Sequence, residues 1–178
     1  NAAVLGNSRG GTGLAAAAVP LYGGIVVSTE RMNRVLEINT ESMYMVVQPG
    51  VRTDDVQKAA KEKGLFYAGD PCSGDSCFIG GNVATNAGGN KAIKYGTTRS
   101  QVYMVEVVTP KGEITRLGGR LNKSSTGYSL EQLIIGSEGT LGIITTITLK
   151  LVPLPQHVLD FLAVFPSSDA AIAFVGIM

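Results

Sequence analysis

The segment from Asp70 to Tyr95 constrains what this chain can fold into more than any other segment. It is rich in Gly, Ser, Asn and Asp, yet it holds apolar residues that a plain surface loop would lack: Ile79, Val83 and Ala84. A core helix would lack its glycine pairs, at 80–81 and 88–89, because each glycine costs about 1 kcal/mol relative to alanine inside a helix. The pairs indicate backbone that lies close to a flat or anionic partner. Two tight turns around a short helix are the alternative that this segment alone leaves open.

The composition is typical of a folded chain with a packed core. The 178 residues fit one domain or part of a larger one. Hydrophobic residues make up 44% and charged residues 16% of the chain, which argues against disorder. The net charge is +1 and no basic stripe runs along the sequence, so we expect no nucleic-acid partner. The 23 glycines fall in clusters, which favours specific close-approach sites over linkers.

The sequence gives no sign of a membrane span or of a metal site. No apolar run reaches the roughly 18 residues of a transmembrane helix, and no signal peptide is visible, although the chain starts at Asn1. Cys72 and Cys77 lack a second ligand pair for zinc, and the one histidine is His157. We expect structural or free thiols, with a disulfide left open. Sparse cysteines are compatible with the cytosol, so we expect a cytoplasmic protein, with membrane association left open.

The first half of the chain predicts three strands and a helix. The strands are expected over 24–28, 34–39 and 43–48, with a polar turn at 39–42. The helix is expected over 53–63, with Thr53 as its N-cap, acidic residues in its first turn and Gly64 as its stop.

The second half predicts a buried strand over 102–109, a hairpin return over 113–117 and a long strand that ends near residue 151. A short helix is expected to begin at Ser129, in capping-box spacing with Gln132. Its expected core face is Leu130, Leu133, Ile134 and Ile135.

The chain changes character at Pro153-Leu154-Pro155, which predicts a domain boundary. Beyond it we expect a strand over 158–165 and then a helix capped by Ser168. The expected apolar face of that helix includes Ile172, Phe174 and Val175.

No hydrolase-like constellation is present, because the one histidine lies beyond this boundary. Asp70 and Glu138 are the two carboxylates within glycine-rich motifs, and loop-organising hydrogen bonds are their expected role, with a catalytic carboxylate pair as the alternative left open. Three glycine clusters, at 10–13, 80–89 and 136–142, each lie beside the end of an expected helix or strand. Their convergence would suit a long phosphate-containing ligand, although the first cluster alone is more typical of a flexible turn.

These motifs also resemble a known family. Asp70-Pro71, Ile79–Gly89, Lys94–Arg99 and Gly136–Thr145 resemble the flavin-binding segments of FAD-linked oxidases of the vanillyl-alcohol oxidase / p-cresol methylhydroxylase type. Within that type they are similar to the glycolate oxidase, D-lactate dehydrogenase and D-2-hydroxyglutarate dehydrogenase branch. Shorter matches lie at Ser8–Pro20, Glu30–Asn33 and Gln48–Val51.

The resemblance implies an α+β fold: a p-cresol methylhydroxylase-type FAD-binding domain, mostly its second subdomain, with an antiparallel sheet flanked by helices. It implies that the pyrophosphate is held by Gly10, Gly11, Thr12 and Gly13. It implies that the pyrophosphate, ribityl chain and isoalloxazine are lined by Asp70, Pro71, Ser76, Cys77, Gly80, Gly81, Asn82, Thr85, Asn86 and Gly88. At the adenine end it places Glu138, Gly142, Ile143 and Ile144.

The chain departs from the family pattern at two positions. Arg9 stands where a glycine is usual, and Phe78 replaces a common threonine. No histidine lies in any of these loops, so the resemblance implies non-covalent FAD.

By the same resemblance, residues 1–152 are an FAD-binding domain that lacks most of its first subdomain, and residues 153–178 begin a truncated C-terminal cap. The implied parent enzyme oxidises a small 2-hydroxy acid by hydride transfer to flavin N5, with substrate groups and the base in the missing cap. The electron acceptor is unknown and a homodimer is left open. We expect this chain alone to be inactive. The alternatives are an inactive flavin-binding module and the flavin domain of an enzyme like alkylglycerone-phosphate synthase.

Overall fold

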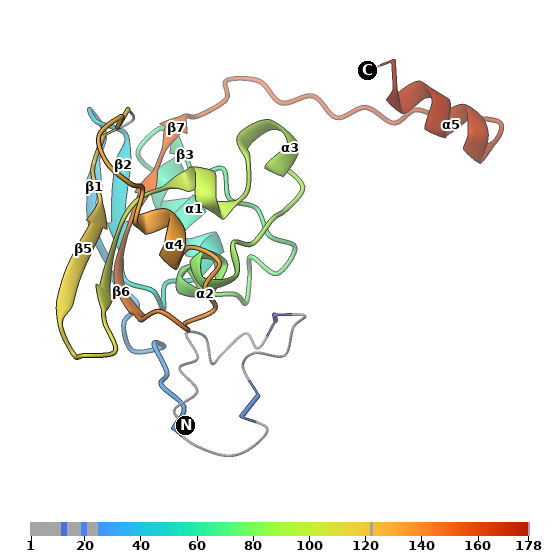
Figure 1. Cartoon of the computed structure of the whole chain (residues 1–178). Coiled ribbons are helices and arrows are strands. Elements are labelled where there is room, and N and C mark those ends of the chain that lie inside the picture. The colour runs from blue at the N-terminus through green and yellow to red at the C-terminus, as the bar shows by residue number, and fades with distance from the viewer. Residues whose placement is uncertain (1–11, 14–18, 21–24, 122, 178) are drawn as a thin grey trace.

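A five-stranded antiparallel sheet forms one layer of the computed structural model, which describes residues 12–13, 19–20, 25–121 and 123–177 (Figure 1). The strand order is β1-β2-β6-β4-β5. The strands are β1 (Val35–Asn39), β2 (Tyr44–Val47), β4 (Val102–Val108), β5 (Ile114–Gly118) and β6 (Ile143–Lys150). All five agree with strands predicted from the sequence, within about two residues at the ends.

Two hairpins and one late strand build this sheet. β1 and β2 join through a turn in which the Ser42 N–H donates to the side-chain oxygen of Asn39 at 2.8 Å, the local bond that makes asparagine a turn residue. β4 and β5 form the second hairpin, and β6 then inserts between the two, paired with both β2 and β4. β6 is therefore the central strand, and its Ile147 and Leu149 are fully buried.

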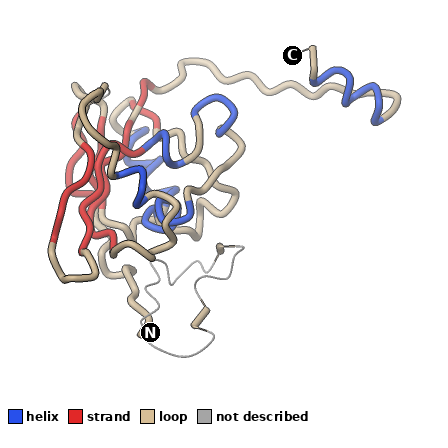
Figure 2. The backbone as a smooth tube through the Cα atoms, in the orientation of Figure 1, coloured by secondary structure: helices blue, strands red, loops and turns tan. Residues whose placement is uncertain are grey.

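Helices cover one face of the sheet (Figures 1 and 2). They are α1 (Thr53–Lys61), α2 (Ile79–Thr85) and α4 (Glu131–Ile134). The short helix α3 (Ala92–Tyr95) and the 3-10 helix η1 (Thr98–Gln101) lead from α2 into β4. The apolar sides of the helices and of the sheet form one core, which includes Val56, Ala60, Ile79, Val83, Ile134, Val47, Val105, Ile147 and Leu149. The α+β class is confirmed.

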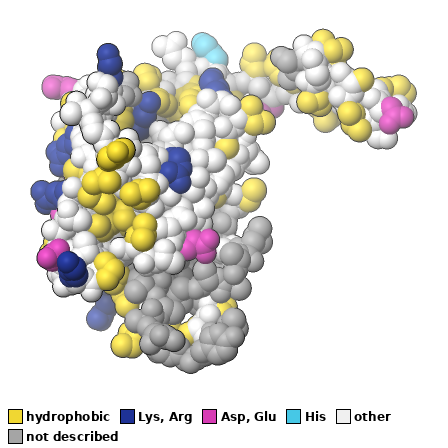
Figure 3. Space-filling view, in the orientation of Figure 1, with side chains coloured by type: hydrophobic (Ala, Val, Ile, Leu, Met, Phe, Trp, Pro, Cys, Tyr) yellow, Lys and Arg dark blue, Asp and Glu magenta, His cyan; other side chains and the backbone are white. Residues whose placement is uncertain are grey.

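The last part of the chain leaves this core. β3 (Leu65–Phe66) pairs with β7 (Val152–Pro153), and an extended segment then leads to α5 (Ser168–Val175) (Figures 1 and 2). Figure 3 shows apolar side chains exposed along α5, and Ile172 and Val175 are 71% and 75% exposed. The strand predicted over 158–165 is wrong, because these residues have no strand partner within the described chain. The domain boundary at 153–155 stays a prediction.

Four local predictions are wrong. Residues 25–28 form no strand, and Gly24 lies outside the described residues. Arg52, not Thr53, is the N-cap of α1, because the Thr53 hydroxyl is buried and bonded elsewhere. α4 begins after Leu130 with no side-chain cap, so the Ser129 capping box is not formed. Ser167, rather than Ser168, caps α5, accepting from the Ala170 N–H at 3.3 Å.

The predicted core face of α4 is half correct. Ile134 and Ile135 are buried, whereas Leu130 and Leu133 are 45% and 62% exposed. The helix is one turn long, so one turn cannot present all four side chains to the sheet.

Among the described residues, none of the helices is long and apolar enough to cross a membrane. In the same part of the chain, no three His, Cys, Asp or Glu side chains come together as metal ligands. Cys72 and Cys77 are both free thiols, as predicted, the first exposed and the second buried.

Candidate functional site

The site begins where α2 rests on the turn after β2. The Gly80 N–H donates to the Pro49 oxygen at 2.8 Å, and a Cβ on Gly80 would lie 2.5 Å from the Pro49 Cβ. Only glycine allows this approach. The Ile79 N–H donates to Val51, and the N–H groups of Gly81 and Asn82 both donate to Phe78. The first N–H groups of α2 are therefore used within the protein.

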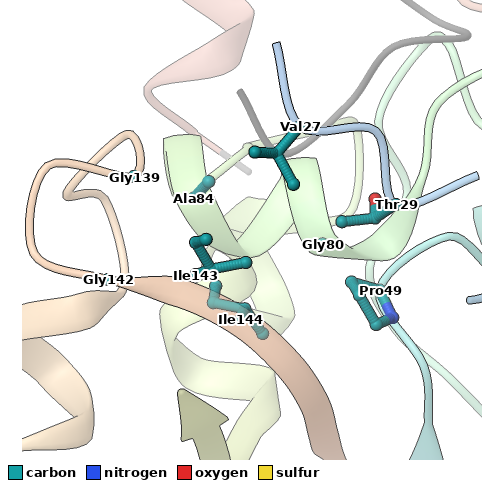
Figure 4. Close-up of a pocket in the computed structure, with 9 residues that line it drawn as sticks. All are labelled: Val27, Thr29, Pro49, Gly80, Ala84, Gly139, Gly142, Ile143 and Ile144. Atoms are coloured by element: carbon teal, nitrogen blue, oxygen red, sulfur yellow. The ribbon is translucent and has the colours of Figure 1, made fainter. Parts of the chain in front are cut away.

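A pocket opens beside this contact (Figure 4). Its walls are the apolar side chains of Val27, Pro49, Ala84, Ile143 and Ile144. The remaining lining is three glycines, at 80, 139 and 142, and Thr29. The pocket thus joins the start of α2 to the start of β6, and it offers apolar surface and bare backbone, which suits the flat ring of a ligand.

The backbone around Glu138 ties these two parts together. The Gly136 and Glu138 N–H groups donate to the carbonyls of Val83 and Ala84 at 3.0 and 2.8 Å. Both carbonyls lie in the last turn of α2, and that of Val83 also accepts from the Asn86 N–H at 3.2 Å, so the end of the helix is tied to the turn at 136–138. Gly142 fits closely against the sheet, since a Cβ there would lie 2.8 Å from the Val108 oxygen. The two motifs that carry the family resemblance are therefore neighbours in space.

Asn86 ends α2 and organises the chain that follows. Its backbone is left-handed, with φ 51° and ψ 52°, a conformation that asparagine tolerates better than most residues. Its side-chain oxygen accepts from the Thr97 hydroxyl and from the Arg99 N–H, both at 2.9 Å. The Asn86 side chain is thus occupied within the protein.

Asp70 and the second glycine pair form an adjoining loop contact. A Cβ on Gly89 would lie 1.9 Å from the Asp70 oxygen, so residues 70–71 pack directly on this glycine. The Asp70 carboxylate pairs with Lys91. By contrast, no described atom lies within 4 Å of a Cβ built on Gly88, which faces open space. Gly88 is therefore free to face a ligand.

Three predicted site residues are bonded in ways that separate them from the pocket. Asn82 is 4% exposed and donates to the Thr53 hydroxyl at 2.6 Å, and the same hydroxyl lies 3.2 Å from the Cys77 sulfur. The Thr85 hydroxyl donates back to the Gly81 carbonyl within α2 at 2.8 Å. The bond from Asn82 to Thr53 joins α2 to α1, whereas the bond of Thr85 lies within α2.

The structure brings four predicted residues into the pocket: Gly80, Gly142, Ile143 and Ile144. Gly81, Asn82, Thr85, Asn86 and Glu138 lie on the elements beside it, and Asp70, Pro71 and Gly88 lie in the adjoining loops. Ser76 is exposed and bonds to Ser73 and Asp75. Thr12 and Gly13 are exposed, and Gly10 and Gly11 lie outside the described residues.

The sequence prediction missed five lining residues: Val27, Thr29, Pro49, Ala84 and Gly139. Pro49, Ala84 and Gly139 lie inside motifs that were recognised, so their motif membership was a usable signal. Val27 lies in the strand predicted over 24–28 and Thr29 directly follows it, so neither residue carried a signal for the pocket.

Comparison with known families decides the assignment. The model of the FAD binding domain matches residues 8–118, well over half of the chain. The chain belongs to this family of FAD-binding domains.

Curated relatives of this domain are similar over nearly its whole length. Glycolate oxidase subunit GlcD of Bacillus subtilis is 47% identical over 161 residues, which is 90% of this chain and 34% of that protein. D-lactate dehydrogenase of Anaerostipes hadrus is 46% identical over 92% of this chain and 34% of its own length. D-2-hydroxyglutarate dehydrogenase of Stutzerimonas stutzeri is 46% identical over 92% of this chain and 35% of its own length. The chain thus spans about a third of the relatives' length.

Among solved structures, alkyldihydroxyacetonephosphate synthase shares the fold. The TM-score is 0.74 at 31% sequence identity, over 88% of this chain and 28% of that chain. The fold prediction is therefore confirmed, and FAD is the cofactor of the family. The apolar pocket walls, the glycines that expose backbone and the open space at Gly88 fit a flat, extended dinucleotide.

Proposed function

We propose that this chain is the FAD-binding part of a flavin-dependent oxidoreductase that oxidises a small 2-hydroxy acid. The observation that carries the proposal is the pocket between the starts of α2 and β6, built from the two longest family motifs. The names of the relatives support the substrate class of glycolate, D-lactate or D-2-hydroxyglutarate. The electron acceptor and a homodimer stay open, and a cytoplasmic location is the expectation.

When bound, the flavin supplies the redox chemistry, and the residues of this chain bind and orient it. Gly88 leaves room for the cofactor, Gly80 and Gly142 let their segments pack closely where they line the pocket, and Ile143 and Ile144 provide apolar contact. The proposed binding is non-covalent, because the one histidine, His157, follows β7 and lies away from these residues in the sequence. We take residues 1–152 as the FAD-binding unit and residues 153–178 as the start of a further domain.

A titration of the purified chain with FAD tests this proposal. We compare wild type with Gly88→Val, which adds a side chain where the described residues leave open space, and with the matched control Gly119→Val. Gly119 also has open space around its Cβ position, but it lies after β5, away from the pocket. We expect saturable FAD binding that Gly88→Val weakens at least tenfold and Gly119→Val leaves unchanged.

Both valine variants should fold with similar urea midpoints, since no described atom lies within 4 Å of the Cβ position at Gly88 or Gly119. A folded wild-type chain that binds no FAD, tested also with extensions at both ends, would refute the proposal. Equal weakening by both variants would contradict the placement of the cofactor at Gly88.

An ether-lipid-type synthase is the second candidate, favoured by the shared fold with alkyldihydroxyacetonephosphate synthase. The higher identity, 46–47%, to 2-hydroxy-acid enzymes favours the first. Assays of the full-length protein with glycolate, D-lactate and D-2-hydroxyglutarate separate the two. Turnover of any of them rules out the synthase and the inert module alike.

A further inference from the structure

An ion pair between Lys91 and Asp70 borders the open face at Gly88. The Lys91 ammonium is bound to Oδ2 of Asp70, and the two side chains are 43% and 28% exposed. The Asp70 backbone oxygen packs against Gly89, because a Cβ on that glycine would lie 1.9 Å from it. The preceding residue, Gly88, has no described atom within 4 Å of its Cβ position. The ion pair therefore lies next to backbone that is free to meet a ligand.

Both members of the pair are held in place by further contacts. Nε2 of Gln57 donates to the Gly69 oxygen at 2.6 Å and to Oδ1 of Asp70 at 3.5 Å. Nζ of Lys91 lies 5.7 Å from the centre of the Phe66 ring, within the range of a cation–π contact. The Asp70 carboxylate thus has a partner inside the protein on each oxygen, and the Lys91 ammonium is directed toward it.

The charge of this pair matters more for a ligand than for folding. Partly exposed ion pairs contribute little to stability, so the folded state gains little from the contact. FAD, by contrast, carries an anionic pyrophosphate, and an unpaired carboxylate nearby would repel it. Such repulsion acts over about 10 Å at moderate ionic strength. An ammonium group bound to the carboxylate cancels most of this field at the open face.

We infer that Lys91 promotes cofactor binding through Asp70: it neutralises the carboxylate, so that an anionic dinucleotide can lie along Gly88. This inference rests on the proposed function. Lys91 is not among the residues that the family resemblance assigns to the cofactor. Its role is to position the ligand by removing a repulsive charge, without touching the ligand itself.

FAD titration of four variants tests the inference. Lys91→Met leaves the Asp70 carboxylate unpaired and should weaken FAD binding about three- to tenfold at low salt. Asp70→Asn leaves the ammonium unpaired and should bind FAD as tightly as wild type or more tightly. The double variant should return to within about twofold of wild type. Lys94→Met is the matched control on the same helix, α3, because the Lys94 ammonium lies over the Tyr95 ring, 5.2 Å from its centre. It should also stay within about twofold.

The opposite signs separate charge from structure. Both single variants break the same contact, so a purely structural role predicts weaker FAD binding in both. The loss in Lys91→Met should also shrink at about 1 M salt, where screening is strong, and the urea midpoints of all variants should stay near that of wild type.

Two results would overturn the inference while wild-type binding upholds the proposed function. One is a loss of FAD affinity in Asp70→Asn equal to that in Lys91→Met. The other is wild-type affinity in Lys91→Met at low salt. Absence of FAD binding by the wild-type chain contradicts the proposed function itself, and the role of Lys91 falls with it.

Discussion

Arg99 donates a hydrogen bond from Nη2 to the carbonyl oxygen of Ile135 at 2.6 Å, joining the chain after α2 to the end of α4. A second donor, Nη1, reaches the Gln132 carbonyl at 2.6 Å and its side-chain oxygen at 3.1 Å. The Arg99 N–H is in turn held by Asn86. One side chain therefore connects the two segments that frame the pocket.

We predict that Arg99→Ala destabilises the chain by about 1–3 kcal/mol, because it leaves the part-buried carbonyls of Gln132 and Ile135 without their charged donor. The loop 136–142 loses its anchor at the same time, so FAD affinity should fall as well. Urea unfolding and FAD titration measure the two effects. Arg99→Lys should be nearly as destabilised as Arg99→Ala, since an ammonium group cannot reproduce the planar, forked set of donors of a guanidinium group.

Arg116→Ala is the control for loss of an arginine. Arg116 pairs with Glu106 across β5 and β4, with its side chain 70% exposed. Such surface pairs contribute about 0–1 kcal/mol, so this variant should be nearly as stable as wild type. Equal losses for Arg99→Ala and Arg116→Ala would mean that the bonds to Gln132 and Ile135 contribute little.

The buried contact between α1 and α2 gives a second prediction. Thr53→Val would leave the Asn82 side-chain amide without its partner, the hydroxyl now 2.6 Å away. An unsatisfied buried donor costs about 1–3 kcal/mol, and we expect a loss of unfolding free energy in that range. Thr53→Ser keeps the hydroxyl and should retain most of the unfolding free energy of wild type. Chemical denaturation of both variants checks the difference, and a Thr53→Val protein as stable as wild type would contradict it.

The alternation of apolar and polar residues, together with the turn and helix-ending residues between elements, was enough to predict the sheet. The alternation of Ile147 and Leu149 with threonines predicted β6, and Gly64 correctly marked the end of α1. The motif resemblance located Gly80, Gly142, Ile143 and Ile144, all of which line the pocket. Local patterns and long motifs therefore carried most of the fold and the glycine part of the site.

What the sequence did not show depends on contacts between distant segments. Thr53 looks like an N-cap, but the packing of α2 on α1 draws its hydroxyl into the core toward Asn82. Thr29 follows the strand predicted over 24–28 and belonged to no predicted element, and the contact of its turn with Gly50 is a contact between distant segments. Such positions are set by tertiary packing, which overrides local propensity.

The carboxylate of Glu106 predicts a pH dependence. It accepts from Arg116 at 2.9 Å and from Thr145 at 3.0 Å, and these bonds, led by that of Arg116, lower the pKa of Glu106 below its ordinary 4.5. The unfolded chain binds this proton more readily, so the stabilisation is present above pH 4.5 and is lost as the pH falls through the folded pKa.

Glu106→Gln should therefore show a smaller loss of unfolding free energy than wild type between about pH 7 and about pH 3. Glu41→Gln, which removes an exposed carboxylate from the turn after β1, serves as the control and should follow the wild-type curve. Parallel curves for wild type and Glu106→Gln would show that Glu106 does not contribute to this dependence.

Glu138 has a φ of +51°, a left-handed backbone conformation that disfavours side chains other than glycine and asparagine. Strain of this kind gathers at functional sites, and Glu138 lies beside the pocket with its N–H bound to Ala84. Glu138→Gly should keep or raise stability by up to about 1 kcal/mol, yet weaken FAD binding several-fold if the carboxylate meets the cofactor.

Met43→Gly provides the matched control, because Met43 has a φ of 50° in the turn between β1 and β2. It relieves similar strain away from the pocket, so FAD affinity should stay at the wild-type value. Glu138→Asn tolerates the same backbone and should weaken FAD binding as Glu138→Gly does. Wild-type affinity in both Glu138 variants would show that the residue shapes the loop without binding the cofactor.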